Sequence, residues 1–73
     1  MLRKKRLKPG AIVNNIRSGL DGVVRGDTKA PGKLRRAHRD YVAVRVERTV
    51  NGKRRLRYPF WLLEHLRKIR YAH

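Results

Sequence analysis

Residues 41–48 carry apolar side chains at every second position, and this pattern constrains the fold more than any other feature of the chain. In an extended strand it places Val42, Val44 and Val46 on one face and their neighbours on the other. We therefore predict a β-strand whose valine face is buried.

Asn51-Gly52 follows this strand and is the strongest short sequence signal for a β-hairpin. If these two residues alone formed the loop, Arg57 would lie opposite Val46 and point a charge into the core. A three-residue loop that adds Val50 places Leu56 opposite Val46 instead. We therefore predict the three-residue loop, with a bulge at the glycine in the left-handed conformation.

The other elements are predicted from apolar runs and turn residues. Before residue 41 they are a strand over residues 11–16, a turn over 18–22 with two glycines that can adopt positive φ, a strand that opens at Val23-Val24, and a long loop over 27–40. After the hairpin loop they are a strand over 53–58, a helical turn or short helix within 60–66, and a last short strand with Ile69 and Tyr71 at the sheet edge. The pattern predicts one all-β domain of five strands over residues 9–71, preceded by a basic arm over residues 1–8.

The hydrophobic core must be small, because a domain of about 60 to 70 residues buries only about 60% of its unfolded surface. The chain has no cysteine, so neither a disulfide nor a thiolate metal site can supplement the core. Tyr58, Phe60 and Trp61 are expected to fill it, whereas Tyr41 and Tyr71 are left exposable. The aliphatic core residues that we expect are Ile12, Val13 or Ile16, Val23, Val42, Val44, Val46, Leu56 and Leu63.

Two segments near the N-terminus carry a resemblance to a known motif. Pro9-Gly10-Ala11-Ile12-Val13, followed by Ser18-Gly19-Leu20-Asp21-Gly22-Val23-Val24, is similar to the KOW motif of ribosomal proteins and transcription elongation factors, in which a strand, a glycine turn and a second strand form one unit. The order of strands also resembles a small Src-homology-3-type β-barrel. The resemblance implies a closed five-stranded barrel that binds RNA, or docks on a ribonucleoprotein, through the loops around the glycine turn. A basic insertion over residues 25–40 departs from the motif and leaves the partner's identity open.

The charge of the chain predicts a polyanionic partner. Lys and Arg number 21 against 5 Asp and Glu, for a formal net charge of +16. Solubility needs a net charge of only about 2 to 8 in a small domain, and further self-repulsion destabilises the compact state. Nucleic acid relieves that repulsion, and each neutralised phosphate releases counterions. We therefore expect a non-enzymatic nucleic-acid-binding protein.

The candidate binding residues form four basic clusters, in which arginine outnumbers lysine, as suits bidentate phosphate contacts. They are Arg3, Lys4, Lys5, Arg6 and Lys8 in the arm; Arg25, Lys29, Lys33, Arg35, Arg36 and Arg39 in and before the long loop; Lys53, Arg54, Arg55 and Arg57 on the hairpin; and Arg67 and Lys68, beside Arg70, near the end. We expect the long loop to supply much of the affinity. Few exposable aromatic or amide side chains are available to read bases, which favours recognition of a structured RNA by its shape, within a ribonucleoprotein.

Two alternatives remain open: a basic adaptor that docks on an acidic protein, and a DNA-binding protein. We expect no catalytic residue, cofactor or metal, because His38, His65 and His73 show no ligand spacing. A metal-independent ribonuclease that uses His65, Tyr71 and His73 is the enzymatic alternative. Residues 1–6 have the charge of a signal-peptide start, but no apolar stretch follows, so we expect a soluble cytoplasmic or virion protein.

Overall fold

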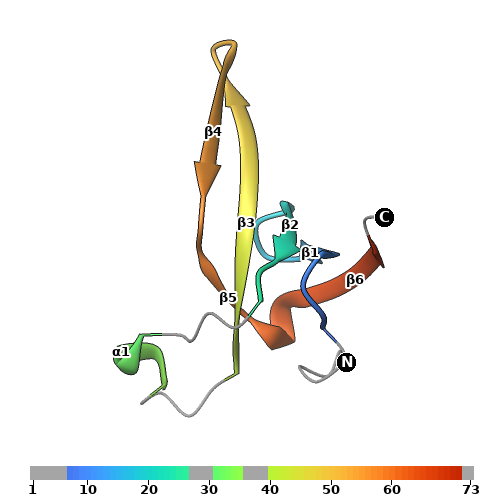
Figure 1. Ribbon diagram of the computed structural model, residues 1–73, viewed down its shortest axis with the longest axis vertical. Helices are drawn as coiled ribbons and strands as arrows, with labels where there is room; N and C mark the ends of the chain where they lie inside the picture. Colours follow the sequence, from blue (N-terminus) through green and yellow to red (C-terminus); the bar gives the residue numbers. More distant parts are fainter. Residues whose placement is uncertain (1–6, 27–30, 36–39, 72–73) are drawn as a thin grey trace.

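The structure is a computed structural model that describes residues 7–26, 31–35 and 40–71. Its strands form one open antiparallel sheet in the order β4-β3-β2-β1-β6, with β5 paired to β3 (Figure 1). The elements are β1 (Ala11–Asn15), β2 (Asp21–Val24), α1 (Gly32–Arg35), β3 (Tyr41–Val50), β4 (Lys53–Arg57), β5 (Phe60–Leu62), the 3-10 helix η2 (Leu63–His65) and β6 (Leu66–Tyr71). The predicted all-β class is confirmed, with six strands in place of five.

The additional strand is β5, which lies where a helical turn was predicted. The backbone N–H of Val44 donates to the carbonyl of Pro59 at 3.0 Å, so β3 continues to pair with the chain between β4 and β5. Aromatic residues fit such a half-buried strand, and Phe60 and Trp61 are both half-buried in β5. The predicted helical turn is therefore confined to η2, and the last strand is confirmed because β6 pairs with β1.

The β3–β4 hairpin differs from its predicted register. Val46 pairs with Arg57, so the loop is the two-residue Asn51-Gly52 and the predicted three-residue loop is wrong. Asn51 and Gly52 have φ angles of 52° and 76°, as a type I′ turn requires. The prediction assumed that the residue opposite Val46 must face the core. The hairpin instead projects from the rest of the sheet, and every residue of β4 is exposed (Figure 1).

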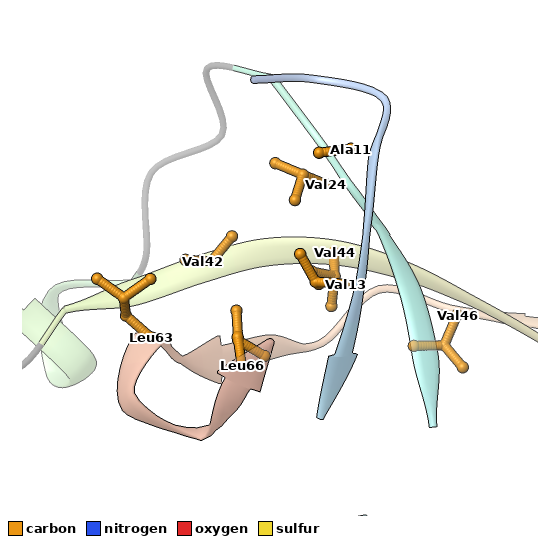
Figure 2. Close-up of a cluster of buried hydrophobic side chains, with 8 residues drawn as sticks. All are labelled: Ala11, Val13, Val24, Val42, Val44, Val46, Leu63 and Leu66. Atoms are coloured by element: carbon orange, nitrogen blue, oxygen red, sulfur yellow. The ribbon is translucent and has the colours of Figure 1, made fainter. Parts of the chain in front are cut away.

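The hydrophobic core forms where the sheet curves back on itself. Side chains from β1, β3 and β6 meet in one cluster (Figure 2). The strands β3 and β6 both contribute to it although two other strands separate them in the sheet. The cluster contains Ala11, Val13, Val24, Val42, Val44, Val46, Leu63 and Leu66, with Leu7, Leu20 and Trp61 packed against it. The expected burial of Val13, Val42, Val44, Val46 and Leu63 is confirmed.

The alternative between Val13 and Ile16 is resolved in favour of Val13, since Ile16 is 51% exposed. Other core predictions are wrong: Leu56 is 40% exposed, and Ile12 and Val23 are only half-buried. At the end of β1 the inward position belongs to the buried Asn15. Its side-chain oxygen accepts hydrogen bonds from the next turn, from Arg17 N at 2.8 Å and from Ser18 N at 3.2 Å. A polar residue therefore occupies the core side of β1 because it orders the turn.

Tyr58 is the clearest departure among the aromatic residues. It was expected to fill the core, yet it is 52% exposed. Trp61 packs against the core cluster from β5, and Phe60 and Tyr41 are half-buried. The chain thus presents a large aromatic ring on its surface at the end of β4.

Gly22 is a glycine because of packing and not because of its φ angle. The positive φ expected in the turn occurs at Gly19, at 74°, whereas Gly22 lies within β2. A Cβ on Gly22 would lie 2.8 Å from Cζ3 of Trp61 and 3.3 Å from Cβ of Val44. Such contacts would push the indole away from the core.

The substitution Gly22→Ala should therefore lower the free energy of unfolding by about 1 to 3 kcal/mol, through overpacking against Trp61. Gly26→Ala is the matched control, since its nearest neighbour would be Cγ of Pro9 at an ordinary 3.5 Å. We expect that control to change stability by about 0.5 kcal/mol or less. Urea denaturation followed by Trp61 fluorescence measures both, and equal values for the two variants would contradict the close packing.

Candidate nucleic-acid interface

The predicted binding residues are distributed unevenly over the structure. Arg3, Lys4, Lys5, Arg6, Lys29, Arg36 and Arg39 lie outside the described residues. Arg35 belongs to α1 and Lys68 to β6. Lys8 before β1, Lys33 in α1 and Arg67 in β6 are exposed and lie apart in the chain, and Arg67 Nη1 donates to the carbonyl of Leu66 at 2.9 Å. The hairpin is where the described structure brings several of them together.

One face of the β3–β4 hairpin carries only positive charge. Cross-strand partners in an antiparallel pair share a face, and the pairs on this face are Val46–Arg57, Arg48–Arg55 and Val50–Lys53. Its charged side chains, all exposed, are Arg48, Lys53, Arg55 and Arg57, and we call this set the cationic ribbon face. No acidic residue occupies any position of these three pairs.

The opposite face of the same hairpin is largely neutralised. Arg54 Nη2 donates to Glu47 Oε2 at 2.9 Å, and Leu56 lies directly opposite Glu47. Arg54, predicted as a binding residue, is thus engaged in an exposed ion pair on the side away from Arg55 and Arg57. The charge of the hairpin is therefore asymmetric.

The cationic ribbon face is electrostatically unfavourable in the free protein. Arg48 lies directly opposite Arg55, and like charges at such positions destabilise a strand pair by up to about 1 kcal/mol. Arg48 was not among the predicted binding residues, and the predicted three-residue loop would have set it opposite Arg54. The preference of Asn-Gly for a two-residue loop is the signal that indicates its pairing with Arg55.

A second surface lies on the side of the sheet away from the core. The pairs Val46–Arg57 and Ala43–Phe60 share one register, which places Tyr58 opposite Arg45. Pairing across the other strands extends this line, which we call the outer row: Tyr58, Arg45, Val23, Ile12 and Arg70. Its middle forms a shallow pocket of about 230 Å³ lined by Ile12, Asp21, Gly22, Val23, Arg45, Glu47 and Arg70.

Arg25 lies against the aromatic end of the outer row. Its guanidinium carbon is 5.0 Å from the centroid of the Tyr58 ring, within the range of a cation–π contact. Its backbone N–H donates to the carbonyl of Ala43 at 2.9 Å, which places Arg25 beside β3 at this position. Because the side chain of Ala43 is small, that of Arg25 can extend across β3 to Tyr58. Arg25 was predicted as a binding residue; its partner Tyr58 was not.

Comparisons of the chain with protein-family models, with curated proteins and with solved structures find no match. In the described part of the chain, no three His, Asp or Glu side chains are grouped as a metal site would require. Nor does any helix within residues 7–26, 31–35 and 40–71 have the length and apolar character needed to span a bilayer. The cationic ribbon face is the candidate phosphate-binding surface, and the outer row is a separate surface on the other face of the sheet.

Proposed function

We propose that this chain is a non-enzymatic nucleic-acid-binding protein that favours structured RNA, and that the cationic ribbon face makes the principal phosphate contacts. The observation that carries the proposal is the charge asymmetry of the hairpin. Arg48, Lys53, Arg55 and Arg57 share one exposed face, while Arg54 on the other face is paired with Glu47. A hairpin that served only solubility would mix the two signs on both faces.

The dimensions of the ribbon support phosphate binding. Cations two residues apart in a strand, such as Arg55 and Arg57, are separated by about 6.8 Å, so the ribbon presents a regular line of positive charge that a phosphate backbone can follow. The base edges in an A-form major groove are out of reach of a protein ribbon, because that groove is deep and narrow. The ribbon would therefore lie along the backbone and recognise the shape of a stem.

We further propose that the open sheet belongs to a small Src-homology-3-type barrel with a KOW-like unit, and that the protein acts in the cytoplasm as part of a ribonucleoprotein. The pairing of β1 with β2 around the Gly19 turn supports the KOW-like unit. The core cluster shared by β1, β3 and β6 supports a sheet that curls toward closure.

The salt dependence of binding tests the class of partner. If the cationic ribbon face alone neutralises four phosphates, log K should fall by about 3 to 4 for each tenfold rise in salt. An acidic protein held by a few exposed ion pairs should respond less. A slope below about 1 with every nucleic acid tested would contradict the proposal.

A competition series at fixed salt tests the preference for structured RNA. It compares a stem-loop RNA, the same stem with compensated base-pair changes, an unstructured RNA of equal length and duplex DNA. We expect the two stem-loops to bind equally and the unstructured RNA to bind more weakly, because shape and phosphates dominate. Equal affinity for all four would show charge neutralisation without selectivity.

A further inference from the structure

We propose that the outer row binds two successive unpaired nucleotides: one base stacks on Tyr58, the linking phosphate meets Arg45, and the next base enters the pocket floored by Val23 and Ile12. The inference rests on the proposed function, since it adds a second contact for an RNA held by the cationic ribbon face. The outer row lies on the opposite face of the sheet, so the unpaired segment passes around the edge strand β4, next to Tyr58. Its basis is the order of side chains along the row: aromatic, cationic, apolar, apolar, cationic.

Tyr58 is held in place before any ligand arrives. The residue before a proline is restricted to extended conformations, and Pro59 is itself fixed by the hydrogen bond that its carbonyl accepts from Val44. Arg25 lies over one face of the ring, and the residue is still 52% exposed, so ring surface remains for a base. A base stacking there would immobilise little that is not already ordered.

Arg25 and Arg45 supply the charge for the phosphates of such a segment. A guanidinium stacked on a ring keeps its in-plane N–H donors available. Arg45 is exposed and lies between Tyr58 and Val23 in the outer row. Neighbouring strands are about 4.8 Å apart, so Tyr58 and Val23 lie about 10 Å apart, with the cation midway. That spacing leaves room for one base at each end and a phosphate between them.

The pocket suits a base better than a phosphate. Two acidic side chains, Asp21 and Glu47, offset the two arginines that line it, so it attracts no excess negative charge. Asn14 Nδ2 donates to Asp21 Oδ1 at 2.9 Å, and Arg54 holds Glu47, which fixes both carboxylates while leaving lone pairs for an exocyclic amino group. At about 230 Å³ the pocket is smaller than the sites of about 300 to 1,000 Å³ that hold drug-sized ligands, so it fits one ring system.

Binding to two hairpin RNAs tests the inference: one has a fully paired stem, and the other has the same stem with a two-adenosine bulge. Wild-type protein should bind the bulged RNA about tenfold more tightly, because stacking of an unpaired base favours it. Tyr58→Leu should abolish that preference without changing affinity for the paired stem. Tyr58→Phe should retain it, because stacking needs the ring and not the hydroxyl.

A 2-aminopurine base in the bulge reports stacking directly. Its fluorescence should fall on binding to wild-type protein and to the Tyr58→Phe variant, and not on binding to Tyr58→Leu. Equal losses of affinity for both RNAs in Tyr58→Leu would overturn the inference, since they would assign the ring a structural role. If wild-type protein binds the two RNAs equally, while loss of Arg48 and Arg55 still weakens both, the outer-row inference fails and the proposed function stands. If neither RNA binds, both fail.

Discussion

Replacing Arg48 and Arg55 together by glutamine should weaken binding to a paired RNA stem about fiftyfold at 0.1 M salt. Each neutralised phosphate changes log K by about 0.9 per tenfold change in salt. Each contact therefore strengthens binding by about eightfold at 0.1 M salt compared with 1 M salt. The salt slope should fall by about 2. The melting temperature should stay the same or rise slightly, because the variant also removes a pair of like charges that lie directly opposite each other.

The matched control is Arg17→Gln with Arg54→Gln, which lowers the net charge by the same amount. Arg17 is exposed in the turn after β1, and Arg54 is paired with Glu47 on the opposite face of the hairpin. We expect less than about a threefold loss of affinity from this control, because neither residue belongs to the cationic ribbon face. Filter binding or fluorescence anisotropy at several salt concentrations measures both variants. Equal losses would mean that net charge, and not the face, determines binding.

The largest effect on stability is expected from Leu66→Ala, at about 3 to 5 kcal/mol. Leu66 belongs to the core cluster and, like Val13 and Val44, is among its largest fully buried side chains (Figure 2). Truncating it removes buried methyl groups and leaves a cavity. A domain of this size has only about 4 to 11 kcal/mol of stability, so a substantial fraction of the variant should be unfolded at 37 °C. Urea denaturation at 25 °C measures the difference.

Leu56→Ala removes the same atoms from a residue that is 40% exposed on β4. We expect it to cost less than about 1 kcal/mol, because no core lies beneath it. A loss as large as that of Leu66→Ala would show that β4 packs on the core, in the register with Leu56 opposite Val46. Val44→Ala, which removes fewer buried atoms than Leu66→Ala, should cost about 2 kcal/mol.

The sequence predicted those parts of the fold in which one face of a strand is buried. Val42, Val44 and Val46 alternate strictly, and they are buried as expected. The same reasoning failed on β4, because an alternation argument has no force where neither face of a strand meets a core. It also failed at Asn15, where a polar residue takes the inward position to bond the following turn.

The candidate site was predictable in its charge and not in its arrangement. Asn51-Gly52 and the run of cations after it predicted a basic hairpin, but only the pairing shows that Arg54 and Arg55 belong to opposite faces and that Arg48 joins Arg55. Tyr58 was assigned to the core because a small domain has few large side chains to fill it. Its contact with Arg25 could not be predicted, because Arg25 lies 33 residues earlier in the chain and no local pattern connects the two.

The position of β4 at the edge of the sheet affects whether the protein stays in solution when it binds a polyanion. In the described sheet β4 pairs only with β3, so its other edge presents unpaired backbone groups, and such edges invite association between chains unless charged side chains keep them apart. The cations of β4 provide that repulsion, and a polyanion that binds them cancels it. Solutions of the protein should therefore stay clear on their own, turn turbid when RNA is added to charge equivalence, and clear again when RNA is in excess and every chain carries negative charge.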